Sequence, residues 1–182
     1  MADETNQAAK AALTGRKAVM IIASSEFRDE ELFTPLEHLR SLGATVQVAC
    51  RRASTTRGVL GRAVTPDITL DKVNAADCDA VIFVGGPGAA MYFKDPAAHK
   101  LAQDAAKAGK VLAAICIAPA ILANAGVLKG KQATCFPSER VTLAQGGARY
   151  QQEAVVRDGN VITADGPRAA AAFAAALAEA LK

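Results

Sequence analysis

Apolar and polar positions along the chain divide it into two kinds of segment. Short apolar or β-rich runs occupy residues 18–23, 45–50, 79–84 and 111–115. Uninterrupted runs of this length are typical of strands that are buried on both faces of a parallel sheet. Because segments of helical character separate several of these runs, the pattern predicts strands and helices in alternation.

Three segments have the character of helices. Four leucines between the first two strands recur at helical spacing and predict an apolar face that ends at Gly43: Leu32, Leu36, Leu39 and Leu42. Pro35 falls near the first turns of this helix, where a missing N–H group costs least. Residues 96–108 have helix-forming composition, and residues 167–181 are Ala-rich and begin with a proline, which suits a first turn.

The remaining segments predict hairpins and a lead-in. Residues 51–77 contain dispersed glycines and short alternating pieces, and we assign them to a small hairpin and a connector. Residues 149–164 contain Asp158-Gly159 between two β-rich runs, which is a strong hairpin signal. Residues 1–16 are expected to be a mobile or marginally helical lead-in, and residues 17–182 to form one domain.

Together these elements predict an α/β fold, a three-layer sandwich around a mostly parallel sheet. Crossovers between parallel strands are expected to be right-handed. The loops that carry chemistry are expected at the C-terminal ends of the strands. With 182 residues, 51% of them hydrophobic, the chain is long enough to bury a full core without disulfide or metal crosslinks.

Charge and hydropathy narrow the possible partners. The 21 Lys and Arg residues against 18 Asp and Glu give a net charge of +3, and apart from Arg51-Arg52 the basic residues are scattered. This pattern argues against nucleic-acid binding. No window approaches the about 20 apolar residues of a membrane span or has the form of a signal peptide. We therefore expect a cytoplasmic protein without a membrane partner.

The metal-binding residue types are dispersed. The cysteines form no CxxC pair and are far apart in sequence: Cys50, Cys78, Cys116 and Cys135. The two histidines, His38 and His99, stand alone. This spacing is wrong for a zinc site, and structural disulfides are rare in a reducing cytosol. The sequence predicts neither a metal nor a cofactor.

Cys116 is the strongest candidate for chemistry. It follows an apolar strand directly and precedes a short helix that begins near Pro119, which is the strand-turn-helix context of a nucleophile elbow. Main-chain amides at the start of the next helix, that of Ile117 among them, favour a thiolate, and such surroundings lower the pKa of cysteine from about 8.5 to about 4–7. The alternative is a small core residue, because Cys116 is flanked by two isoleucines.

Gly85 and Gly86 end the preceding strand, and their amides can approach a reacting oxygen because no side chain intervenes. They do not form a dinucleotide fingerprint, because Met91 occupies the place of the third glycine.

An acidic cluster supplies the third component. Glu31 is the last residue of Asp29-Glu30-Glu31, near the start of the first helix. In a desolvated pocket beside the thiol, such a carboxyl group would stay protonated and donate a hydrogen bond to the thiolate. The alternative is a solvated acidic first turn that the helix dipole favours. The residues alone do not choose among the three acids.

The ordered motifs resemble the ThiJ/PfpI superfamily with its DJ-one branch, over residues 17–181: Glu31-Leu-Phe-Thr-Pro35, Val84-Gly-Gly-Pro-Gly88, Ala114-Ile-Cys116-Ile-Ala-Pro119 and Thr163-Ala-Asp-Gly-Pro167. The resemblance implies a flavodoxin-like sandwich and a homodimer or an assembly of dimers. It also implies that Cys116 is the reactive cysteine, Glu31 its buried carboxyl partner, and Gly85 and Gly86 the amides that face the thiol.

Two departures from this resemblance bear on function. Ile117 stands where the peptidase branch has histidine, and Phe136 stands where the DJ-one branch has histidine. Arg28, Phe136 and Pro167 are expected to border the pocket. There Arg28 could attract a carboxylate-bearing substrate, although a solvated arginine at a helix start is the alternative.

The superfamily includes metal-free and glutathione-free glyoxalases, deglycases, peptidases, redox sensors and chaperones, and the fold does not choose among them. We expect a cofactor-independent enzyme that uses Cys116 and Glu31 on a small reactive dicarbonyl or a glycated adduct. A non-catalytic redox sensor or chaperone is one alternative, and an intracellular cysteine peptidase of the PfpI type is another.

Overall fold

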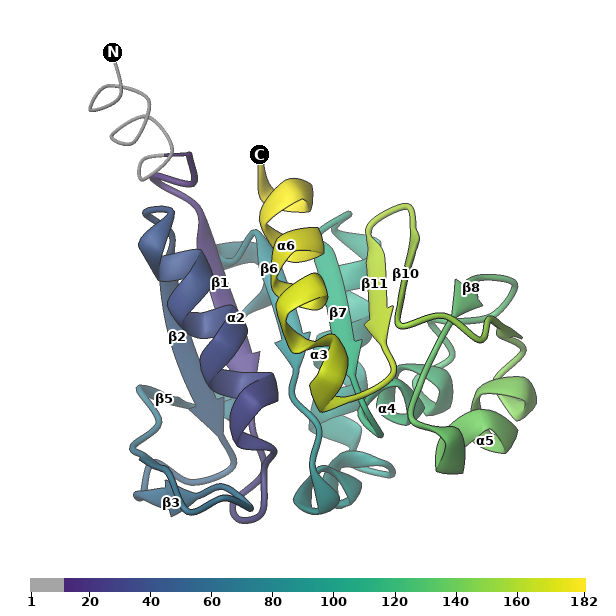
Figure 1. Cartoon of the computed structure of the whole chain (residues 1–182), viewed down its shortest axis with the longest axis horizontal. Helices are drawn as coiled ribbons and strands as arrows, with labels where there is room; N and C mark the ends of the chain where they lie inside the picture. The colour runs from purple at the N-terminus through teal and green to yellow at the C-terminus, as the bar shows by residue number, and fades with distance from the viewer. Residues whose placement is uncertain (1–11) are drawn as a thin grey trace.

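A seven-stranded sheet forms the centre of the molecule in a computed structural model that describes residues 12–182 (Figure 1). The strand order is β10-β11-β7-β6-β1-β2-β5. The strands are β1 (Lys17–Ile21), β2 (Thr45–Cys50), β5 (Ile68–Thr69), β6 (Ala80–Phe83), β7 (Val111–Ile115), β10 (Val155–Asp158) and β11 (Val161–Ala164). The β10–β11 pair is antiparallel and the other pairs are parallel, which confirms the predicted sheet.

Helices cover both faces of this sheet, as predicted for a three-layer α/β sandwich. Helices α2 (Asp29–Ser41) and α6 (Ala170–Leu181) pack side by side on one face, and α3 (Pro96–Lys107) and α4 (Pro119–Asn124) lie on the other (Figure 1). A short helix, α5 (Arg140–Gln145), packs against α4.

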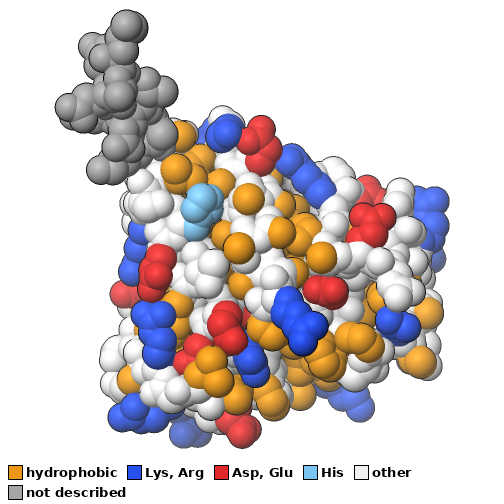
Figure 2. Space-filling view, viewed as in Figure 1, with side chains coloured by type: hydrophobic (Ala, Val, Ile, Leu, Met, Phe, Trp, Pro, Cys, Tyr) orange, Lys and Arg blue, Asp and Glu red, His pale blue; other side chains and the backbone are white. Residues whose placement is uncertain are grey.

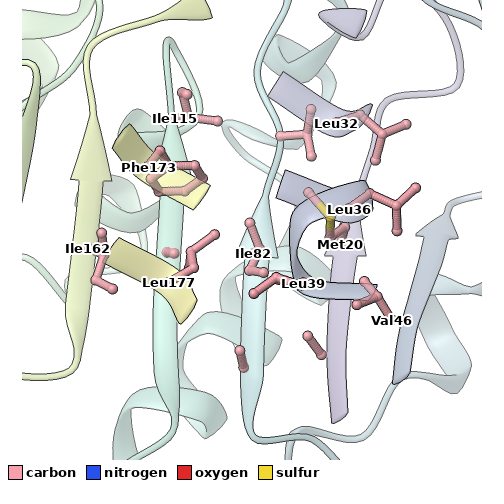
Figure 3. Close-up of a cluster of buried hydrophobic side chains, with 14 of the residues drawn as sticks. Met20, Leu32, Leu36, Leu39, Val46, Ile82, Ile115, Ile162, Phe173 and Leu177 are labelled. Carbon is pink, nitrogen blue, oxygen red and sulfur yellow. The ribbon is translucent and has the colours of Figure 1, made fainter. Parts of the chain in front are cut away.

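The core has two layers because successive strand residues point to opposite faces. In β1, Met20 faces α2 and α6, whereas Val19 and Ile21 belong to the layer on the other face. Figure 3 shows the first layer, where side chains of the sheet meet Leu36 of α2 and Phe173 of α6. Burial on both faces explains the continuous apolar runs of the central strands β1, β6 and β7.

The irregular segments differ in part from the predicted ones. Residues 51–77 contain the predicted hairpin, β3 (Thr56–Arg57) with β4 (Ala63–Val64), and also β5, which extends the main sheet beside β2. The pair β8 (Gln132–Ala133) with β9 (Arg149–Tyr150) and the helix α5 were not predicted as such. These elements are too short to give a periodic signal.

The start of the described chain is docked on the domain. Leu13 is fully buried, and its N–H donates to the Leu42 carbonyl at 2.8 Å. Residues 1–11 of the predicted lead-in lie outside the described residues.

The surface over α2 and α6 carries charges of both signs around a central group of hydrophobic atoms (Figure 2). Within residues 12–182, no helix has the length and apolar character needed to cross a membrane.

Candidate functional site

Cys116 lies where β7 ends, in a strained backbone conformation with φ of +65°. A residue with a Cβ adopts this region at a cost of about 1–2 kcal/mol. Two hydrogen bonds hold the strained residue: its N–H donates to the Ala164 carbonyl at 2.9 Å, and its carbonyl accepts from the Phe136 N–H at 2.7 Å. The geometry is that of the elbow predicted from the sequence.

Glu31 is fully buried beside this elbow. It lies in the first turn of α2, and its Oε2 accepts a hydrogen bond from the Gly85 N–H at 3.0 Å. The other oxygen, Oε1, is buried without a hydrogen-bond partner within 12–182. The Cys116 thiol lies close enough to this carboxyl group for each of the two to shift the pKa of the other. Of the three clustered acids, Glu31 is therefore the one that meets the thiol.

The loop after β6 requires glycine at two positions. A Cβ on Gly85 would overlap Glu31 Oε2 and lie 2.6 Å from Cys116 Cβ. Gly86 has φ of +96°, and a Cβ there would overlap the Arg28 backbone nitrogen. The loop is thus pressed between α2 and the elbow, with no room for side chains.

The amides around the thiol differ in part from the expected set. Gly86 and Ile117 provide the main-chain N–H groups that lower the pKa of Cys116. The N–H of Gly85, which was also expected to face the thiol, instead donates to Glu31. The Gly85 N–H thus positions the Glu31 carboxyl group, while the N–H groups of Gly86 and Ile117 lower the pKa of the Cys116 thiol.

Burial dominates the proton affinity of Glu31. It raises the pKa of this carboxyl group to about 8, against the hydrogen bonds to Cys116 and Gly85, which lower it. Glu31 is therefore mostly protonated at neutral pH.

Burial also raises the pKa of Cys116, to about 12, and the charge of an ionised Glu31 adds to this effect. The sequence prediction of a lowered thiol pKa thus misses the cost of burial. When Glu31 is protonated, the charge that helps to raise the thiol pKa is absent. The ionisation of Glu31 and that of Cys116 are therefore coupled, and the apparent pKa values describe the pair rather than either group alone.

A small cavity of about 240 Å³ opens onto the thiol. It is lined by Arg28, Gly86, Pro87, Cys116, Ile117, Phe136, Ser138 and Pro167. The structure thus brings together Arg28, Phe136 and Pro167, the three residues expected at the pocket from sequence. Ser138 was missed, because only the folded loop after β8 places it there.

Arg28 lies at this pocket with its guanidinium bound by Glu30. Its Nε donates to Glu30 Oε2 at 2.9 Å and its Nη2 to Oε1 at 3.0 Å. Both side chains are about one-third exposed (31% and 37%), so Arg28 is not fully solvated, and two of its N–H donors are already bound by Glu30. Neither His38 nor His99 lines the cavity.

The other thiols lack these features. Cys50 is 1% exposed at the end of β2, and its Sγ lies 3.5 Å from Ser24 Oγ and 4.0 Å from the Tyr92 hydroxyl. Cys135 is fully buried, and burial followed by the charge of Glu139 raises its pKa to about 12. Neither thiol lines the cavity.

Cys78 precedes β6 and borders a larger cavity of about 290 Å³ at the N-terminal ends of β1 and β2. This is the edge opposite to the one where parallel sheets usually bind ligands. Burial and the charge of Asp77 raise the pKa of the Cys78 thiol. In the part of the chain that the structure describes, no three His, Cys, Asp or Glu side chains converge as metal ligands.

The fold and the site define a class of α/β proteins that carry a strained cysteine at an elbow beside a buried carboxyl group. The chain belongs to the DJ-1/PfpI family, whose model matches residues 16–180.

Known proteins agree with this assignment. The chain is 40% identical over 160 residues to an uncharacterized protein of Methanocaldococcus jannaschii, covering 86% of this chain and 78% of that one. It is 33% identical over 149 residues to a deglycase of Pyrococcus horikoshii, covering 82% and 90%. It is 28% identical over 171 residues to a glutathione-independent glyoxalase of Caenorhabditis elegans, covering 93% and 91%.

The fold also matches solved structures. The ThiJ/PfpI domain protein of Brachyspira murdochii superposes with a TM-score of 0.89 at 31% identity, covering 92% of this chain and 98% of that one.

Proposed function

We propose that this chain is a cysteine-dependent enzyme that converts small reactive dicarbonyls, or their adducts, to hydroxy acids without a cofactor. The observation that carries the proposal is the juxtaposition of Cys116, which lines a cavity of about 240 Å³, with the buried and protonatable Glu31. Relatives named deglycase and glyoxalase support the same class of chemistry.

The first step forms a covalent adduct. The Cys116 thiolate attacks the aldehyde carbon of a 2-oxoaldehyde, and a carbon–sulfur bond forms as the carbonyl π electrons move to oxygen. A proton is delivered to this oxygen from Glu31, directly or through water, which gives a hemithioacetal and a Glu31 carboxylate. The amides of Gly86 and Ile117 lie where they can stabilise negative charge at the site.

The second step is an internal proton transfer. The Glu31 carboxylate removes the proton from the former aldehyde carbon, and the resulting enediol is reprotonated at the neighbouring carbon. The substrate is thereby isomerised to a 2-hydroxy thioester with no external oxidant. Water then hydrolyses the thioester, which releases the hydroxy acid and regenerates the thiol. An early adduct of an amine would lose the amine in the course of the same conversion.

The direct test is lactate formation from methylglyoxal. Cys116→Ala should abolish it, whereas Cys78→Ala, which removes a thiol from the opposite sheet edge, should leave it unchanged. Equal lactate formation by wild type and Cys116→Ala would reject the enzyme.

The same thiol suits the alternative of a redox sensor, since a reactive thiolate is readily oxidised to sulfenic and sulfinic acid. Mild peroxide should then add oxygen selectively at Cys116, with no turnover of methylglyoxal. The peptidase alternative has no such support, because no histidine lines the cavity.

A further inference from the structure

The charged residues at the cavity differ from its other walls. Pro87, Ile117, Phe136 and Pro167 give it a mostly apolar lining. Arg28 is the lining residue with a basic side chain, and two of its guanidinium nitrogens are already bound by both oxygens of Glu30. A carboxylate that entered the cavity would find this pair of donors occupied.

Resting on the proposed function, we propose that Glu30, by occupying Arg28, makes the cavity select neutral, apolar-substituted 2-oxoaldehydes and exclude those that carry a carboxylate.

Three features of the site act in this direction. Two parallel N–H···O bonds hold the Arg28–Glu30 pair, so an incoming carboxylate must either displace Glu30 or bind the remaining N–H groups of a guanidinium whose charge Glu30 already balances. A substrate anion would also meet the negative charge of Glu30 and of a Cys116 thiolate, and like charges repel at short range. Finally, the apolar lining of the cavity favours contact with an apolar substituent and offers few hydrogen-bond donors to a carboxylate.

The charge of Glu30 also affects the reacting pair, Cys116 and Glu31. Its charge raises the pKa of Glu31, while the charge of Arg28 lowers it. Both groups are thus close enough for a change in either to alter the site, although neither touches the reacting atoms.

Alkylation of Cys116 tests this inference independently of catalysis. Iodoacetamide is neutral and iodoacetate is its carboxylate analogue, and both react with the same sulfur. The measured quantity is the ratio of their rates at Cys116, by mass spectrometry, relative to the ratio for N-acetylcysteine. Division by the iodoacetamide rate removes changes that arise from thiol ionisation alone.

The wild type should prefer iodoacetamide by about tenfold beyond N-acetylcysteine, as repulsion at a partly desolvated site predicts. Glu30→Gln should reduce that preference by about fivefold or more, because it frees Arg28 for the anion. Glu30→Gln combined with Arg28→Gln should lose this gain in iodoacetate reactivity. The matched control is Glu37→Gln, which removes the same charge from the same helix at the exposed pair with Arg62 and should not change the ratio.

A Glu30→Gln ratio within about twofold of the wild-type ratio would overturn the selectivity, because that is the scale of a screened surface charge. A turnover assay with phenylglyoxal and 4-carboxyphenylglyoxal, a 2-oxoaldehyde of the same frame that carries a carboxylate, separates this failure from failure of the proposed function. Turnover of both substrates at similar efficiency rejects the selectivity alone. No turnover of either, with the alkylation preference intact, rejects the enzyme and supports exclusion of anions from the cavity.

Discussion

At the scale of single residues, the site depends on where one proton lies. Glu31 is buried with a raised pKa, and the N–H groups of Gly86 and Ile117 lower the pKa of Cys116 against the effect of burial. In this account Glu31 supports the thiolate as a neutral donor and becomes a base only after the substrate has taken its proton.

Two substitutions of Glu31 test the donor role. Glu31→Gln keeps a neutral hydrogen-bond donor, so the Cys116 alkylation rate at pH 7 should stay within about tenfold of wild type. Glu31→Leu removes the donor and leaves the thiol to the effect of burial, so the rate should fall by about 100-fold or more. Equal loss in both variants would mean that a neutral hydrogen-bond donor at this position does not support the thiolate.

Glu31 should also make the stability of the protein depend on pH. The carboxyl group is protonated in the folded state up to about pH 8, whereas it ionises near 4.5 when unfolded. The unfolded state therefore binds fewer protons between these values, and stability falls as pH rises, by about 1.4 kcal/mol per unit.

Glu31→Gln should remove this slope and be the more stable protein at pH 7, by up to roughly 3 kcal/mol. Urea unfolding of both proteins at pH 5 and pH 7.5 measures the difference. A constant difference between the two pH values would show that Glu31 does not titrate in this way.

Some residues of the site could be predicted from the sequence, and others could not. Cys116 was found because a strand that runs directly into a short helix marks an elbow. Glu31 could be proposed but not separated from Asp29 and Glu30, because their roles depend on partners distant in sequence. Those partners are Gly85 for Glu31 and the tip of the β3–β4 hairpin for Asp29.

At the scale of elements, the start of α2 is fixed to the β3–β4 hairpin. Asp29 is buried, and its carboxylate accepts from the N–H groups of Leu60 at 2.7 Å and Arg62 at 2.9 Å. The hairpin therefore holds the helix turn that also carries Glu31. The long elements were predictable from apolar periodicity, but this contact lies between a helix turn and a short loop without a periodic signal.

Asp29→Ala should destabilise the protein by about 2–4 kcal/mol, because two charge-assisted hydrogen bonds to a buried carboxylate are lost. Urea unfolding measures the change, and faster hydrogen exchange at the Leu60 and Arg62 amides would localise it. Glu37→Ala on the same helix is the control and should cost less than about 1 kcal/mol. A similarly small effect of Asp29→Ala would mean that the hairpin does not support the helix.

At the scale of the whole molecule, the four thiols should differ in accessibility. Cys50 and Cys135 are 1% and 0% exposed, whereas Cys116 is 8% exposed and lines the cavity. Cys78 is partly exposed, but it lies at the opposite edge of the sheet from the amides that lower the pKa of Cys116. In the native protein, a limiting amount of iodoacetamide at pH 7.5 should label Cys116 first, and denaturant should be needed for Cys50 and Cys135. Peptide mass spectrometry reads the order, and uniform labelling would contradict it.

The assembly implied by the family resemblance stays a prediction. A homodimer would have twice the 18.7 kDa mass of the chain, which sedimentation velocity measures directly.

The pH dependence of Cys116 alkylation tests the central claim most directly. If protonated Glu31 and the two amides hold the charge on sulfur, the rate should rise with a midpoint at or below about 8.5, the ordinary pKa of a cysteine thiol. Burial beside an ionised Glu31 would instead place the pKa of the thiol at about 12. A midpoint above about 9, the ordinary range of a thiol raised further by burial, would contradict the account.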